Sequence, residues 1–247
     1  MLTVLLLFAA GFWAGAQNAL AGGGSFVTLP ALLIAGLDAK LANIASCIAL
    51  FPGQVTSGLA GRHMIEDVPG LRFRTLSLIS LAGGALGAML LLITSAAAFD
   101  RLVPWLVLAA TAIFAWGNFM KRPHGEKAHI GPVGTAVLQG AIALYGGYFS
   151  GGMGFLMIAL LTVAGLSVRG ASAAKNILAG LINAAAVLLF LVSTRVPLIE
   201  VSVLGAGAMA GGLWGVWLLR RINDLWLRIG ILILGLVLFA AMFVRAY

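Results

Sequence analysis

The chain has 247 residues, of which 62% are hydrophobic and only 9% are charged, and its formal net charge is +8 at pH 7. A soluble domain carries roughly 25% charged residues, so this composition excludes a water-soluble globular protein and a disordered chain. A single cysteine, Cys47, excludes an intramolecular disulfide and a zinc or iron–sulfur site built from cysteines. We therefore expect an all-α integral membrane protein whose basic loops lie on one membrane face, rather than a nucleic-acid-binding protein.

Ten apolar segments follow one another along the chain, and all are predicted to be helices, because backbone exposed to lipid must satisfy its own hydrogen bonds. They are Leu2–Ala21, Phe26–Leu37, Leu41–Ala60, Leu76–Ala98, Leu102–Met120, Pro132–Phe149, Met153–Leu166, Ala171–Leu191, Val201–Leu219 and Leu225–Val244. The second and seventh have only 12 and 14 residues. Helices of that length rise ~18–21 Å, which is too short for a hydrocarbon core of about 30 Å. Each of the two follows a cluster of glycines.

The two halves of the chain resemble each other at an offset of 129 residues. Between Gly11 and Ile48, 12 of 38 positions are identical to their counterparts in the second half. The identities include the glycine pairs 22–23 and 151–152, and the run Ala-Gly-Leu at 35–37 and 164–166. We therefore predict two repeats of five segments each, over residues 1–120 and 132–247, joined by a cytoplasmic linker over residues 121–131.

An odd number of segments per repeat predicts that the second repeat starts from the opposite membrane face, so that the repeats are inverted. When Lys and Arg are assigned to alternate faces, eleven fall on one face and four on the other. The positive-inside rule makes the eleven-charge face cytoplasmic and places both termini outside. A model with ten crossings and a model with six crossings and two re-entrant hairpins give the same eleven-to-four division of charges, so both models stay open. Inverted repeats with short helices at matching positions indicate a secondary transporter with its site near the membrane midplane.

The glycine clusters are the first candidate binding residues, because each lets the backbone turn and aims the N-terminus of a short helix into the protein. Two such positive helix ends would hold an oxyanion, whereas close helix packing is the alternative role of the same glycines. Leucine at Gly23 or Gly152 is predicted to abolish transport while the protein still folds. The candidates are Gly22, Gly23, Gly24 and Ser25 in the first half, and Gly151, Gly152, Met153 and Gly154 in the second.

Lys175 is a basic residue inside the eighth predicted segment, about one turn from its start. An intramembrane charge usually faces a cavity and serves function, so Lys175 is predicted to attract the anion; the alternative is snorkelling to the headgroups. Its counterpart in the first repeat is Ser46, so the site is expected to be asymmetric in charge.

Side-chain amides are the remaining candidates. Asn176 and Asn183 follow Lys175 on the same segment, and Asn183 aligns with Gln54 in the first repeat. These three are predicted to donate hydrogen bonds into the cavity. Asn18, before the first glycine cluster, is predicted to line it, with hydrogen bonding between helices as the alternative. Three neighbours of the clusters either line the same cavity or bond between helices: Gln17, Tyr145 and Tyr148.

All seven acidic residues lie in loops or at segment ends. Cation channels and carboxylate-based ion carriers usually need a carboxylate within the membrane, so this distribution favours an anion as the substrate. The sequence also lacks the Ser/His, paired-Asp or metal constellation of an intramembrane protease. We therefore expect no enzymatic activity, no cofactor and no metal.

These residues resemble the TauE/SafE sulfite exporter family of bacterial anion transporters. The resemblance rests on AGGGSFVTLPAL at 21–32 and GGYFSGGMGFLM at 146–157, and it extends to AAKNIL at 173–178 and the glycines of 83–87. It implies a transporter of the inner membrane that moves sulfite or a sulfonate such as sulfoacetate, usually outward. The expected partners are then a small sulfur-containing anion and the lipid bilayer, without nucleic acid, and a homodimer is left open. The alternatives are transport of another small organic anion and a non-transporting membrane scaffold.

Overall fold

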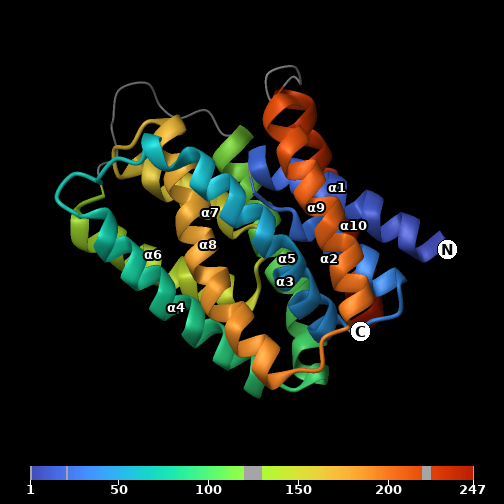
Figure 1. Cartoon of the computed structure of the whole chain (residues 1–247). Helices are drawn as coiled ribbons and strands as arrows, with labels where there is room; N and C mark the ends of the chain where they lie inside the picture. Colours follow the sequence, from blue (N-terminus) through green and yellow to red (C-terminus); the bar gives the residue numbers. More distant parts are fainter. Residues whose placement is uncertain (1, 21, 120–129, 219–223, 247) are drawn as a thin grey trace.

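The structure is a computed structural model that describes residues 2–20, 22–119, 130–218 and 224–246. Over these residues the chain forms ten α-helices and one short 3₁₀ helix, without strands (Figure 1). An all-α fold, with one helix for each predicted apolar segment, is therefore confirmed. In chain order the elements are α1 (Leu2–Leu20), α2 (Ser25–Ile34), α3 (Ala39–Gly61), the 3₁₀ helix η1 (Arg62–Met64), α4 (Phe73–Ile93), α5 (Ala96–Phe119), α6 (Pro132–Tyr148), α7 (Met153–Val163), α8 (Val168–Ser193), α9 (Leu198–Leu218) and α10 (Asp224–Ala246).

The boundary between the fourth and fifth helices differs from the sequence prediction. The predicted fourth segment runs to Ala98, but α4 ends at Ile93 and α5 already begins at Ala96. Thr94 is extended, and the Ser95 hydroxyl accepts a hydrogen bond from the backbone N–H of Ala98 at 3.2 Å. This side-chain cap starts α5 early, and apolar composition does not reveal it because alanines continue past the break.

Four helical stretches of the described residues are long and apolar enough to cross a membrane: Leu2–Ala19, Phe73–Ile93, Ala96–Ile113 and Gly170–Ser193. The short helices α2 and α7 have 10 and 11 residues, which corresponds to a rise of about 15–17 Å.

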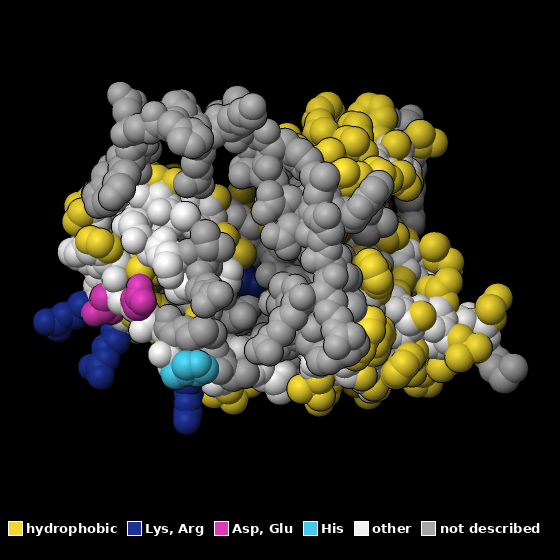
Figure 2. Space-filling view, turned by 90° about the horizontal axis from the view of Figure 1, so that it is seen from above, with side chains coloured by type: hydrophobic (Ala, Val, Ile, Leu, Met, Phe, Trp, Pro, Cys, Tyr) yellow, Lys and Arg dark blue, Asp and Glu magenta, His cyan; other side chains and the backbone are white. Residues whose placement is uncertain are grey.

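Large apolar side chains cover much of the outer surface; Val192, for example, is 88% exposed and Leu2 is 81% exposed. In Figure 2 hydrophobic side chains dominate one side of the view, and the charged side chains gather at the opposite edge. Contiguous apolar surface of this extent requires a partner, and lipid supplies it around apolar helices of spanning length. The chain is thus a multi-pass α-helical membrane protein.

Two pairs of helices from opposite halves pack through glycines. α1 packs along α9, and α4 packs along α6 (Figure 1). A Cβ added at Gly15 would overlap the carbonyl of Ala208 in α9, and one at Gly87 would overlap the carbonyl of Leu144 in α6. Small residues allow this close approach of backbones, which stabilises helix association where lipid removes the hydrophobic driving force. Packing is therefore the role of these glycines.

Equivalent positions of the predicted repeats adopt the same local structure around the short helices. Each short helix ends at its Ala-Gly-Leu run, with φ of +101° at Gly36 and +109° at Gly165. In both runs the leucine N–H bonds to the carbonyl five residues earlier, which closes the helix end. The next helix then begins at a side-chain cap, Asp38 for α3 and Ser167 for α8. The strongest sequence identity between the halves thus encodes a shared turn.

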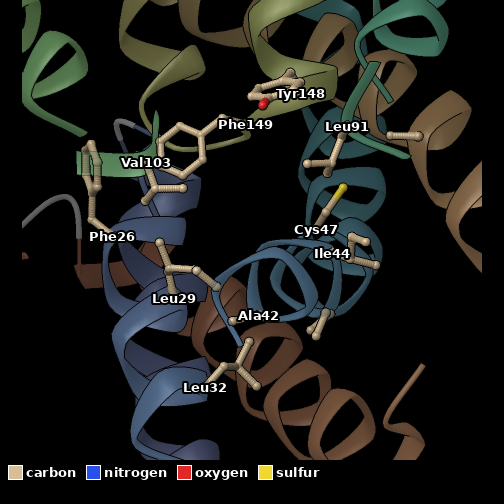
Figure 3. Close-up of a cluster of buried hydrophobic side chains, with 14 of the residues drawn as sticks. Phe26, Leu29, Leu32, Ala42, Ile44, Cys47, Leu91, Val103, Tyr148 and Phe149 are labelled. Atoms are coloured by element: carbon tan, nitrogen blue, oxygen red, sulfur yellow. The ribbon is translucent and has the colours of Figure 1, made fainter. Parts of the chain in front are cut away.

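The largest cluster of buried side chains joins the two halves (Figure 3). Phe26 and Leu29 of α2 and Val103 of α5 lie near Phe149, which directly follows α6. Because lipid is as apolar as this interior, the cluster stabilises the fold by close packing rather than by transfer out of water. It holds α2, and with it the first glycine cluster, against the second half.

Lys40, near the start of α3, binds the end of α4. Its Nζ donates to the carbonyl oxygens of Leu92 at 3.0 Å and Thr94 at 2.6 Å. A cation at a helix C-terminus is stabilising because the last carbonyls have no intrahelical partner. We expect Lys40→Met to lower the free energy of unfolding by about 1–2 kcal/mol, measured as a lower thermal transition in detergent. The exposed Arg195, changed to Met, is the control; equal losses in the two variants would contradict the prediction.

Candidate functional site

The two glycine clusters lie against each other at the starts of α2 and α7. A Cβ added at Gly22 would lie 3.0 Å from the Cα of Gly154. The hydroxyl groups of Ser25 and Ser150 are 2.9 Å apart and share a hydrogen bond between the halves. The structure thus brings together two segments that lie more than a hundred residues apart in the sequence.

A phenylalanine from the opposite half covers each glycine pair. A Cβ at Gly23 would lie 2.6 Å from the ring of Phe155, and one at Gly152 would lie 3.4 Å from the ring of Phe26. Phe26 and Phe155 are counterparts in the two repeats, so the contact is reciprocal. Gly23 and Gly152 also have φ of +81° and +80°, a conformation that favours glycine. Both the turn and the close contact therefore require glycine at these positions.

Two neighbouring side chains hold the loops in place. Gln17 donates from Nε2 to the carbonyl of Gly23 at 3.2 Å, and Tyr145 donates from its hydroxyl to the carbonyl of Gly151 at 2.6 Å. Of the two interpretations of these side chains, hydrogen bonding within the protein is the one that the structure shows. Tyr148 packs its ring against Phe99, with ring centroids 5.7 Å apart.

A pocket lies beside the loops, between α1, α3, α7, α8 and the start of α2. Polar groups from both halves of the chain converge on it. Its wall consists of Asn18, Gly23, Ser25, Gln54, Ser150, Met153, Gly154, Lys175, Asn176 and Ala179. A second pocket, between α1, α3 and α9, shares Asn18 with it. Most of the predicted site residues are thus in one wall.

Lys175 places a cation in this pocket. Its side chain is 2% exposed, and its Nζ donates to the backbone carbonyl of Asn18 at 3.2 Å. Among the described residues no carboxylate forms an ion pair with it. An ammonium group has three N–H donors, so donors remain for a ligand. The side chain points into the protein, whereas a snorkelling lysine would extend to the surface.

Asn183 and four of the glycines do not line the pocket, contrary to the sequence prediction. Asn183 is 1% exposed and donates from Nδ2 to Oε1 of Gln54 at 2.6 Å. It therefore reaches the pocket only through Gln54, because packing between α3 and α8 encloses it. The four glycines form the buried backbone of the loops behind the wall: Gly22, Gly24, Gly151 and Gly152.

Ser150 lines the pocket but was not among the predicted residues. The available signal was its polar side chain directly before Gly151, within a segment that otherwise consists of apolar residues and glycine. Ser46, the repeat counterpart of Lys175, is fully buried, and its hydroxyl bonds that of Thr28 at 2.5 Å. The described pocket wall thus carries a cation from the second half only.

An apolar helical exterior around a buried polar pocket defines a multi-pass membrane protein of the transporter class. The sequence model of the family described as sulfite exporter TauE/SafE matches residues 7–242. This match spans nearly the whole chain, so the chain belongs to the TauE/SafE family.

Curated relatives are similar over much of the chain. A probable membrane transporter protein, ORF9, from Sinorhizobium sp. is 32% identical over 173 residues, which are 68% of this chain and 64% of that protein. A probable membrane transporter protein from Haemophilus influenzae is 25% identical over 239 residues, 96% of this chain and 93% of the relative. The probable membrane transporter protein YfcA of Escherichia coli K12 is 24% identical over 193 residues, 77% of this chain and 71% of the relative.

Proposed function

We propose that this chain is a secondary transporter of the inner membrane that moves sulfite or a small organosulfonate similar to sulfoacetate, with export as the direction, by alternating access. The observation that carries the proposal is Lys175, which is buried in a pocket formed with both glycine loops and has no carboxylate partner among the described residues. A buried cation is costly unless it is paired, and an anionic substrate would pair it. The family described as sulfite exporter supports a sulfur oxyanion as that substrate.

The other groups of the wall suit the same head group. Ser25 is the first residue of α2, and Met153 is the first residue of α7, and both line the pocket. The first N–H groups of a helix have no intrahelical acceptor, and the helix dipole adds partial positive charge there. Sulfite and sulfonate oxygens accept hydrogen bonds only, so hydroxyl, amide, ammonium and backbone N–H donors all match them.

We also propose that residues 1–120 and 132–247 are inverted repeats, and the direction of equivalent helices supports this. Gln54 of α3 bonds Asn183 of α8, and Gly58, one turn later in α3, packs against residues 176–177, earlier in α8. The two helices are thus antiparallel although they are counterparts in the repeat. Counterparts that run in opposite directions would enter a membrane from opposite faces.

The last helices of the two halves, α5 and α10, show the same antiparallel relation. Trp105 of α5 contacts Phe239 of α10, and Thr111, later in α5, packs against Gly235, earlier in α10. Together with the positive-inside rule, this arrangement supports the proposal that the eleven-charge face is cytoplasmic and that both termini lie outside. Residues 121–129 of the predicted linker, and Arg220 and Arg221 of that face, lie outside the described residues.

A non-transporting scaffold would need no polar cavity. Lys175 and Asn18 line one, which favours transport, whereas Asn183 lies in a helix contact as either function would allow. Transport of another small organic anion by the same pocket remains the alternative within transport.

The test is uptake of radiolabelled sulfite and sulfoacetate into proteoliposomes that contain the purified protein. We expect saturable uptake of at least one of them, with competition by the unlabelled anion and no uptake by protein-free liposomes. Uptake of a carboxylate such as acetate in place of both sulfur anions would overturn the substrate class. A protein that moves neither kind of anion but remains folded would overturn the transporter proposal in favour of the scaffold.

A further inference from the structure

Gln54 and Asn183 are counterparts in the two repeats, 129 residues apart, and their side chains are hydrogen-bonded to each other. Two counterparts can touch only where the axis that relates the repeats passes between them. The pair therefore marks the centre of the α3–α8 contact, next to the pocket that Gln54 lines. The axis, and the exchange proposed from it, rest on the proposed function, because both require inverted repeats.

The two amides are not equivalent in this structure. Asn183 donates from Nδ2 to Oε1 of Gln54, and Gln54 faces the pocket with 7% of its surface exposed. Asn183 lies behind it with 1% exposed, and its Oδ1 is buried with no hydrogen-bond partner in the part of the chain that the structure describes. A buried carbonyl oxygen without a donor is unfavourable and is rare in native structures. Among the described residues, the Asn183 amide thus has a hydrogen-bond partner for its Nδ2 group but not for its Oδ1 atom.

We propose that the two amides exchange roles during transport. In this state Gln54 contacts the anion and Asn183 positions it; in the opposite-facing state Asn183 contacts the anion, and Gln54 positions it by donating from Nε2 to Oδ1 of Asn183. In an inverted-repeat transporter each half adopts, in one state, the conformation that the other half has in the second state. The exchange supplies a donor to the oxygen that lacks one here.

Amide side chains suit such an exchange because each carries both a donor and an acceptor of the same geometry. The bond can therefore reverse direction without moving a proton or a charge. A Lys–Asp pair at the same place has a fixed donor and a fixed acceptor and could not reverse. The proposal thus explains why both repeats carry an amide here, whereas the counterpart of Lys175 is a serine.

Thiol accessibility tests the exchange. Cys47 is the only cysteine and is 2% exposed, so Cys47→Ala supplies the background. Gln54→Cys and Asn183→Cys are introduced singly, and a membrane-impermeant methanethiosulfonate that carries a sulfonate is applied to either side of oriented proteoliposomes. We expect the Gln54→Cys variant to react from one side and the Asn183→Cys variant from the other. Saturating sulfite should slow both reactions about tenfold or more.

Ala45→Cys and Ala174→Cys are matched controls, because these alanines are also repeat counterparts on α3 and α8 and both are fully buried. We expect neither to react from either side. Reaction of both test variants from the same side, or of Gln54→Cys alone in a background that transports, would overturn the exchange. Absence of transport in wild type and background, with no protection by sulfite, would instead overturn the proposed function.

A second pair of variants avoids dependence on cysteine. The double exchange Gln54→Asn with Asn183→Gln retains both amides, and we expect it to lose less sulfite uptake than Asn183→Leu, which removes one of them. Asn183→Leu leaves Gln54 without its donor, and we expect sulfite to bind the folded variant about tenfold more weakly. A purely structural role would lower the thermal transition of Asn183→Leu and leave its affinity for sulfite unchanged, which would overturn the proposal.

Discussion

Leucine at Gly152 is expected to abolish transport and to destabilise the folded state strongly, rather than to leave the fold intact as the sequence alone suggests. Gly152 has φ of +80°, and the left-handed conformation costs other residues about 1–2 kcal/mol. A Cβ there would also lie 2.8 Å from the Cβ of Ala110 in α5, and overpacking of this kind costs about 1–3 kcal/mol. The sum is a large part of a typical stability of about 5–15 kcal/mol.

Gly23, the counterpart of Gly152, allows the cost of the backbone conformation to be measured separately from the cost of the steric contact. Its added Cβ would meet the far end of the Phe155 ring, at 2.6 Å from Cε2, and a shorter side chain could relieve that contact. We expect Gly23→Ala to lower the thermal transition in detergent, and Phe155→Leu in the same chain to restore part of the loss. The remainder reflects φ of +81°, which no neighbouring substitution relieves.

Gly180→Ala is the matched control, because a Cβ there meets nothing within 4 Å and the residue lies inside α8. Alanine is the better helix former by about 0.5–1 kcal/mol, so this variant should be as stable as wild type or more so. A Gly152→Leu protein that unfolds at the wild-type temperature and transports normally would show that the loops do not need glycine.

The helices could be predicted from the sequence because the signal is local. A segment in contact with lipid must be apolar along its length and must form its own hydrogen bonds, so composition alone locates it. The start of α5 at Ala96 rests on the hydroxyl of Ser95 instead, a single cap within a run of small residues. The role of Lys40 could not be predicted either, because its acceptors lie at the end of a different helix.

The sequence predicts most of the residues that form the candidate site, but not which of them line the pocket. The repeat identifies Gln54 and Asn183 as equivalents, yet only one of them lines the pocket, because the packing around α3 and α8 differs between the halves. Neighbouring glycines differ in the same way: Gly23 lines the pocket, whereas a Cβ at Gly24 would meet the carbonyl of Ala14 at 2.8 Å. Which side of a turn faces the cavity is a tertiary property, and the local sequence does not contain it.

Lys175 should be the substitution that separates function from stability most clearly. Its ammonium group is buried beside the carbonyl of Asn18, without an ion-paired carboxylate among the described residues. In the empty protein this charge is unfavourable, because a low-dielectric interior stabilises a cation only when it is paired. Lys175→Met keeps most of the apolar stem and removes the charge, so we expect the thermal transition without substrate to stay equal or rise.

The affinity for the anion should change in the opposite direction. A charge-assisted hydrogen bond contributes on the order of 1.5–3 kcal/mol, which corresponds to about tenfold or more in affinity. We therefore expect Lys175→Met and Lys175→Ala to bind sulfite at least about tenfold more weakly, measured by titration of the purified protein, and Lys175→Glu more weakly still. Arginine should restore binding only in part, because its planar fork presents donors differently from a compact ammonium group.

The control for this series is an exposed basic residue, Arg195→Ala, and not Lys40, whose loss would disturb the end of α4. We expect Arg195→Ala to bind sulfite as wild type does. Equal affinities for wild type, Lys175→Ala and Lys175→Glu would show that the charge does not contribute to recognition of the anion. Recognition would then depend on the two helix N-termini and Gln54. In that case a neutral residue at position 175 would raise stability without any loss of transport, and the buried cation would have no part in binding the anion.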